Sequence, residues 1–374
     1  MSPFNEKPQD NENPFLLNPY DPPREDSSTE KPAEPVRITF FSSPQPNMLM
    51  AFIWTLGLMF FQVVVGGVFG IGLLLISAFA FRESISPGGL PPWITNILIP
   101  VGTLTTLAAA VAVCALYYRG QTKRRIAWRF CSMTQLFLVA LSVVPLATVA
   151  SEVVNWAGEY LPNLNGAVFA SFSQQPFLLV FIAACVLPGL GEEIFFRGFV
   201  HHGLSKRYGM IPTILVTSLL FGFMHVDPVQ SCGAAFLGMW LHYLVWHTKS
   251  LAAPIILHVL NNTLAFVSMK FADFFPIPGV TYTEVGRTTH TPLLLLSAAV
   301  AAGIPLGLAI WQCRTYWVLP DGKRWESGID EPDVPDESLE AVASYDGVSI
   351  TTWLAIAATY ASFIAAMVIA SQSV

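Results

Sequence analysis

Residues 48–81 read MLMAFIWTLGLMFFQVVVGGVFGIGLLLISAFAF, 34 consecutive positions without Asp, Glu, Lys or Arg. About 20 apolar residues suffice for a helix to cross the hydrocarbon core of a bilayer. The whole chain of 374 residues is 53% hydrophobic and only 12% charged, about half the charged fraction of a soluble globular protein. The sequence therefore predicts a polytopic membrane protein, and it excludes a soluble enzyme, a secreted protein and a fibrous protein.

Eight further apolar segments follow the first, and together they predict an all-α transmembrane bundle of about eight or nine helices. They are 95–118, 132–151, 176–197, 210–225, 232–248, 251–271, 291–312 and 349–371. The segments 210–225 and 232–248 are short for a full crossing, so we expect neighbouring helices to shield them from lipid.

The apolar segments divide the chain into four parts. Residues 1–46 form a Pro-rich acidic tail that we expect to be disordered, because it has too few apolar residues to offset the entropy cost of ordering. Residues 47–312 form the predicted transmembrane domain. Residues 313–348 form an acidic loop, and residues 349–374 carry a last transmembrane helix.

Basic residues in the loops predict the orientation of the bundle. With nine crossings and a cytoplasmic N-terminus, all of the 19 Lys and Arg residues except Arg82, Lys270 and Arg287 fall on the cytoplasmic side. We therefore expect an integral, multi-pass protein of the cell membrane whose tail and acidic loop are cytoplasmic. Membrane lipid is an expected partner. Nucleic acid is not, because no basic stripe interleaved with aromatic residues occurs.

Several charged residues occur together within one apolar helix, in Leu187-Pro188-Gly189-Leu190-Gly191-Glu192-Glu193-Ile194-Phe195-Phe196-Arg197. A charge near the bilayer centre costs roughly 2.5–3.5 kcal/mol on insertion scales, so such residues indicate a functional site. Glu193 and Arg197 are four apart on one helical face and can form an ion pair. Glu192 is rotated by about 100° and is left to face a cavity, where it could act as a general base. The alternative is a helix end with ordinary snorkelling charges.

Two histidines and an asparagine lie in the following apolar segments. His225 ends Phe221-Gly222-Phe223-Met224-His225, and His258 and Asn262 lie four apart on one helical face. With a free glutamate, they supply a base, donors for a developing oxyanion and candidate metal ligands. They predict hydrolysis at a carbonyl. In this hypothesis Glu192 and His225 activate water, while His258 and Asn262 stabilise the tetrahedral intermediate.

With these motifs the sequence resembles the CPBP, or Rce1-like, family of intramembrane proteases, the CAAX prenyl endopeptidases and bacteriocin-processing enzymes. The family motifs are filled as EExxxR at Glu192, Glu193 and Arg197, FxxxH at Phe221 and His225, and HxxxN at His258 and Asn262. The resemblance covers about 175–265, roughly a quarter of the chain. We expect this region to be the family core of a transmembrane protease domain at 47–312, although the resemblance does not extend to the outer helices. It implies a helical bundle enclosing a conical active-site chamber, with Glu192 as the catalytic base. The implied substrate is a peptide bond near the C-terminus or leader of a membrane-associated or lipidated protein.

Three alternatives stay open. His225, His258 and Glu192 could form a three-ligand zinc site of a metalloendopeptidase, or Glu192 could act without metal. A non-catalytic scaffold or tolerance factor could bind peptides in the same chamber. A transporter is the third class, since intramembrane Glu and His also serve proton relays. Zincin and rhomboid-type serine proteases are unsupported, because neither HExxH nor GxSG occurs.

The other histidines are expected to lie outside the site. His201 and His202 should lie at the cytoplasmic interface, solvated or against lipid headgroups, because they follow the end of an apolar segment. His242 and His247 should pack or anchor a helix at the interface, and His290 should be solvated in an exterior loop.

Overall fold

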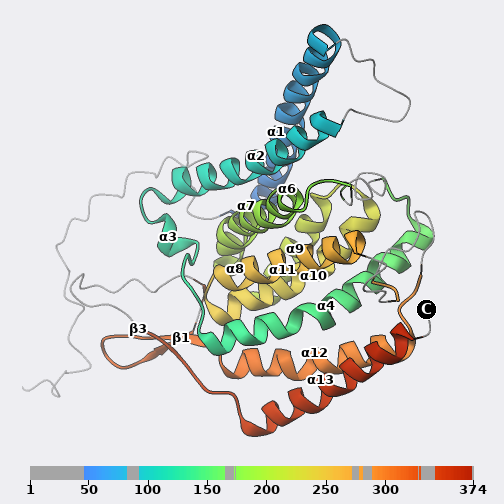
Figure 1. Ribbon diagram of the computed structural model, residues 1–374. Coiled ribbons are helices and arrows are strands. Elements are labelled where there is room, and N and C mark those ends of the chain that lie inside the picture. Colours follow the sequence, from blue (N-terminus) through green and yellow to red (C-terminus); the bar gives the residue numbers. More distant parts are fainter. Residues whose placement is uncertain are drawn as a thin grey trace, which may run out of the picture. The chain divides into compact units, whose positions relative to one another are not determined.

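The computed structural model (Figure 1) describes a helical membrane domain with a small β-sheet. The described residues are 46–81, 92–164, 172, 174–271, 278–280, 289–326, 328–329 and 342–372. The predicted disordered tail, apart from its last residue, lies outside the described residues, as does much of the predicted acidic loop.

Each predicted apolar segment coincides with a helix. The helices are α1 (Met48–Ile76), α2 (Pro92–Tyr118), α4 (Met133–Tyr160), α9 (Met210–Phe223), α10 (Pro228–Thr248), α11 (Ala252–Lys270), α12 (Leu293–Gln312) and α13 (Ile350–Ser371), with the short α3 (Thr122–Arg125) between α2 and α4. The fourth segment is a continuous helical run of α6 (Phe177–Val180), η2 (Phe181–Val186), α7 (Leu187–Glu193), η3 (Ile194–Val200) and α8 (His201–Tyr208). The η elements are π-helical turns, and a further one, η1 (Ser77–Phe81), extends α1.

Seven helical stretches within the described residues are long and apolar enough to cross a membrane, fewer than the nine crossings predicted. They are Met48–Phe79, Asn96–Tyr118, Met133–Tyr160, Phe177–Tyr208, Ala252–Lys270, Leu293–Gln312 and Ile350–Ser371. With 14 residues, α9 is too short, because at 1.5 Å per residue it reaches only about 21 Å of a core of roughly 30 Å. The more polar α10 is not among the seven.

Two glycines bring α7 close to helices on either side of it. A Cβ atom at Gly189 would lie 2.6 Å from Val259 Cγ2 of α11, and one at Gly191 would lie 3.0 Å from Leu107 Cα of α2. Only glycine permits backbones to approach so closely. The glycines therefore hold the end of α7, with its two glutamates, between α2 and α11.

Residues 313–348, predicted as a loop, contribute a three-stranded antiparallel sheet. Its strands are β1 (Thr315–Val318), β2 (Arg324–Trp325) and β3 (Val342–Tyr345), in the order β2-β1-β3. The register pairs Trp317 with both Trp325 and Ala343. The run Thr315-Tyr316-Trp317-Val318 consists of β-branched and aromatic residues that favour strands, and Trp317 is buried. The all-α prediction thus holds for the membrane domain but not for this segment.

Candidate active site

A helical hairpin brings the first two motifs to the same depth of the bundle. α8 ends and α9 begins at Gly209, whose φ of +75° suits glycine at a sharp turn. Glu192 precedes Gly209 by 17 residues and His225 follows it by 16. Because both arms are helical, each residue lies roughly 25 Å from the turn. The spacing of the motifs along the chain therefore places Glu192 and His225 level with each other.

Glu193 and Arg197 form the predicted ion pair, and it is fully buried. Arg197 Nη1 lies 2.8 Å from Glu193 Oε1, and both side chains are 0% exposed. Arg197 Nη2 also donates to the main-chain oxygen of Gly238 in α10 at 3.2 Å. The guanidinium carbon lies 4.4 Å from the centroid of the Phe221 ring. Arg197 thus neutralises Glu193 and ties η3 to α10 in one position.

His258 lies between the two glutamates and bonds to Glu193, a contact that the sequence did not predict. Its Nδ1 lies 2.8 Å from Glu193 Oε1, the oxygen that also receives Arg197. Its Nε2 faces Glu192 Oε2 at 3.9 Å, which is too long for a hydrogen bond. Because the paired carboxylate of Glu193 accepts, Nδ1 carries a proton. Glu193 therefore sets the orientation of the His258 ring and turns Nε2 towards Glu192.

Glu192 keeps one carboxylate oxygen without a hydrogen-bond partner. Its side chain is 13% exposed, and Oε2 is buried with no partner among the described residues. Buried carboxylate oxygens are nearly always hydrogen-bonded, so an unpartnered one needs an explanation. Water or a substrate group placed between Glu192 Oε2 and His258 Nε2 would supply it.

His225 is oriented by its own helix. Its Nδ1 lies 2.8 Å from the main-chain oxygen of Phe221, and since a carbonyl only accepts, Nδ1 donates. In the neutral ring Nε2 is then the acceptor. The Phe221 ring lies edge-to-face against His225 at 5.0 Å and against His258 at 5.8 Å between centroids. Phe221 thus contacts Arg197 and both histidines and shapes the site. Within the described residues, no hydrogen bond joins His225 to Glu192.

Asn262 in α11 is held by a contact with η2. Its Nδ2 donates to the main-chain oxygen of Ala184 in η2 at 3.3 Å. An amide nitrogen carries two N–H groups, so this bond leaves one donor for another acceptor. Asn262 therefore fastens α11 to η2 one turn beyond His258.

The predicted zinc ligands do not converge in this arrangement. A zinc site needs donor atoms within about 2.0–2.2 Å of one point. Across the described residues, no group of three or more His, Cys, Asp or Glu is placed to hold a metal ion. His225 and His258 each direct Nδ1 to another acceptor, which leaves their Nε2 atoms alone as candidate ligands. The set of Glu192, His225 and His258 does not fit zinc here, and no catalytic step is assigned to it.

A buried histidine pair lies one helical turn beyond Arg197. His201 Nδ1 and His242 Nδ1 are 3.0 Å apart, with their rings stacked. His201 is 0% exposed and His202 is 3% exposed, so the prediction that both are solvated is wrong. The helix does not end at Arg197 but continues as α8, which turns His201 towards α10. The pairs Arg197–Gly238 and His201–His242 thus form two successive contacts between parallel helices.

Comparison with known proteins finds a match over the region that contains the candidate site. Residues 174–264 match the family model described as type II CAAX prenyl endopeptidase Rce1-like. This region belongs to the Rce1-like family. It contains all six candidate site residues and runs from α6 into α11.

A curated relative points to the same class of protein. The protein named "Putative membrane peptidase YdiL" of Bacillus subtilis (strain 168) is 28% identical to this chain over 90 residues. Those residues are 24% of this chain and 36% of the relative, so the chain matches about a third of the relative's length. No solved structure matches the chain. The similarity to the Rce1-like family therefore concerns the site region, and the helices outside it have no counterpart in this match.

Proposed function

We propose that the protein is an intramembrane endopeptidase of the CAAX type. Its substrate would be a peptide bond near the C-terminus or leader of a membrane-associated or lipidated protein. The observation that carries this proposal is the unpartnered Oε2 of Glu192 beside Nε2 of His258, while neighbouring Glu193 is neutralised by Arg197. Oε2 of Glu193 has no partner among the described residues either, so the two carboxylates differ in their cation: Glu193 pairs with Arg197 and is structural, and Glu192 is left for chemistry.

In the proposed mechanism Glu192 acts as the general base. It takes a proton from water while the resulting hydroxide attacks the carbonyl carbon of the scissile bond, and it then passes that proton to the leaving amine. His225 Nε2, which is the acceptor of the neutral ring because Nδ1 donates to Phe221, helps to orient the water. Both groups lie at the same depth of the bundle, as this step requires.

The tetrahedral intermediate carries a negative charge that needs donors. His258 supplies one from Nε2 when its ring carries both protons, while its Nδ1 is held by the Glu193 carboxylate. Asn262 supplies the second from the N–H that Ala184 does not receive. Glu193 and Arg197 act as positioning residues, because they reach the chemistry only through His258.

A direct test uses purified full-length protein in detergent and three internally quenched peptides. One peptide is farnesylated at a C-terminal CAAX sequence, one has the same sequence without the lipid, and one carries a leader sequence. Glu192→Gln should lower kcat by at least about 10³-fold, the scale of general acid–base catalysis. The matched control Asp321→Asn removes a surface carboxylate next to the sheet and should leave kcat unchanged. Full activity in Glu192→Gln would refute the mechanism.

Binding measurements separate the enzyme from a peptide-binding scaffold. Glu192→Gln should still bind the peptide that the wild type cleaves, since the change is nearly isosteric. A wild-type protein that binds one of the peptides and cleaves none of them would support the scaffold.

A further inference from the structure

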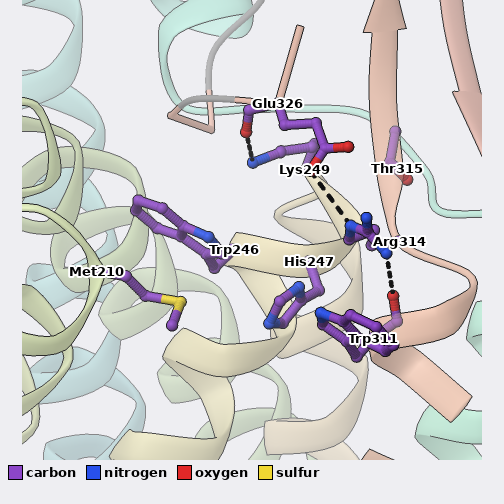
Figure 2. Close-up of a pocket in the computed structure, with 8 residues that line it drawn as sticks. All are labelled: Met210, Trp246, His247, Lys249, Trp311, Arg314, Thr315 and Glu326. Atoms are coloured by element: carbon purple, nitrogen blue, oxygen red, sulfur yellow. Dashed lines mark hydrogen bonds and ion pairs between the residues drawn. The ribbon is translucent and has the colours of Figure 1, made fainter. Parts of the chain in front are cut away.

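A polar cavity lies outside the candidate active site, where three helix ends meet. Its volume is about 190 Å³. Figure 2 shows its lining, which comes from the end of α10, the end of α12, the first residue of α9, the start of β1 and Glu326 after β2. None of the six motif residues of the candidate active site lines it.

The cavity lies at the edge of the membrane-spanning part of the bundle. The candidate span of α12 ends at Gln312, two residues before the cavity residue Arg314. Trp246 and Trp311 flank the space, and tryptophan is enriched where a membrane meets water. The adjoining turn contacts the basic loop after α2, because Ser250 Oγ donates to the main-chain oxygen of Arg129. Under the predicted orientation, this end of the bundle is cytoplasmic.

The lining contains two cations and one carboxylate. Arg314 Nε lies 3.3 Å from Glu326 Oε2, and Arg324 pairs with the other oxygen of the same carboxylate. Lys249 Nζ donates to the main-chain oxygens of Glu326 at 2.8 Å and of Gly328. Partial burial raises the pKa of Glu326, but the guanidinium groups of Arg314 and Arg324 together lower it by more. The pKa of Glu326 therefore lies below its usual range. The carboxylate is therefore ionised and shared, and the cavity keeps an excess of positive charge.

Each cation is backed by an indole ring. Lys249 Nζ lies 5.1 Å from the Trp246 centroid, and Arg314 Cζ lies 4.9 Å from the Trp311 centroid. Such cation–π contacts fix the position of a long charged side chain. Lys249 also ends α10 with φ of +50°, in the left-handed region where glycine is the usual residue. The chain thus places a buried lysine where a helix end would ordinarily favour glycine.

We infer that this cavity binds a phosphate group. A guanidinium and an ammonium from opposite sides are the groups that proteins use for phosphate. The volume equals about six water molecules at roughly 30 Å³ each, which holds a phosphate ester with a few waters. It is smaller than the roughly 300–1,000 Å³ of sites for drug-sized ligands, so it does not accommodate a peptide or an acyl chain. The phosphate belongs to a phospholipid headgroup or to a soluble phosphate.

The test titrates full-length protein in detergent with two probes and measures binding by calorimetry. One probe is a short-chain phosphatidylglycerol, with short-chain phosphatidylcholine as its zwitterionic comparison, and the other is inorganic phosphate. Arg314→Gln should weaken binding of the phosphate-bearing probe about tenfold. Glu326→Gln should instead strengthen it several-fold, because it removes the carboxylate that competes for Arg314. Damage to the fold would weaken binding in both variants. Weaker binding in Arg314→Gln together with stronger binding in Glu326→Gln therefore identifies the cavity as the binding site.

Lys323→Gln is the matched control, since Lys323 is 79% exposed at the same sheet and does not line the cavity. Its affinity should equal that of the wild type. Tight binding of phosphatidylglycerol alone assigns the site to a lipid headgroup, and equally tight binding of inorganic phosphate assigns it to a soluble ligand. Binding of neither probe, or binding that Arg314→Gln leaves unchanged, overturns the inference. None of these readouts depends on peptidase activity.

Discussion

His258 Nδ1 lies 2.8 Å from Glu193 Oε1, the same oxygen that receives the guanidinium of Arg197. A carboxylate that binds one nitrogen of an imidazole fixes its tautomer and directs the other nitrogen. Here the directed atom is Nε2, which faces Glu192. The two adjacent glutamates of the EExxxR motif therefore have different tasks, and variants should separate them.

Glu193→Gln should lower both stability and activity, whereas Glu192→Gln should lower activity and leave stability unchanged. Without the carboxylate, Arg197 becomes a buried charge without its counter-ion, which typically costs about 3–5 kcal/mol. Thermal unfolding in detergent should show a lowered Tm for Glu193→Gln and a wild-type Tm for Glu192→Gln. A lowered Tm in both variants would mean that Glu192 also has a structural role.

Arg197→Ala should destabilise the protein by a similar amount, because it removes the counter-ion of Glu193 in the core. Arg197→Lys should restore only part of the lost stability. A lysine has a single nitrogen, which does not reproduce the fork that reaches both Glu193 and the main-chain oxygen of Gly238. The matched control is Arg207→Ala at the exposed end of α8, which should leave Tm unchanged. An unchanged Tm in Arg197→Ala would contradict the ion pair.

The membrane helices and the ion pair could be predicted because their signals are local. Hydropathy marks every apolar helix, and the spacing of Glu193 and Arg197 by one helical turn indicates their contact. The contact between His258 and Glu193 joins residues 65 positions apart, so it depends on the packing of α11 against α7. That packing in turn requires the close approach at Gly189, which hydropathy does not reveal.

The two predictions that were wrong, the solvated histidines after Arg197 and the loop at 313–348, failed for physical reasons. The apolar segment ending at 197 is followed by two histidines, which are polar in isolation and indicate the end of a membrane helix. The helix continues because His201 finds its partner on another helix, at His242. The β-sheet was missed because β1 has only four residues and its partner β3 is 24 positions away along the chain.

The buried histidine pair yields a test of coupling between α8 and α10. His201→Phe or His242→Phe alone should destabilise the protein, because the remaining ring loses the partner of its Nδ1, a loss of about 1–3 kcal/mol for a buried polar group. The double variant should lose less stability than the two single variants lose together, since two stacked phenyl rings leave no buried nitrogen without its partner. Thermal unfolding of the four proteins gives the coupling energy. Additive losses would show that the 3.0 Å contact contributes nothing to stability.

His290 should make stability depend on pH near neutrality. Its hydrogen bonds to Glu159 and Glu152, at 2.7 and 2.8 Å, raise its pKa above the usual 6.5. These bonds join α4 to the segment before α12, and the expected solvated loop histidine is therefore a link between helices. A pKa raised in the folded state adds stability that is complete below pH 6.5 and is lost as the pH rises through the folded pKa.

The Tm of the wild type should accordingly fall as the pH rises above 6.5 and through the raised pKa of His290, while His290→Gln should lose this part of the pH dependence. The difference between the two proteins is the relevant measurement, because other groups that titrate in the same range cancel in it. Since His290 is exposed, solvent screening keeps the effect small, and a scan at low ionic strength will show it best. Identical pH profiles for the wild type and His290→Gln would mean that the bridge to Glu152 and Glu159 does not favour the protonated ring.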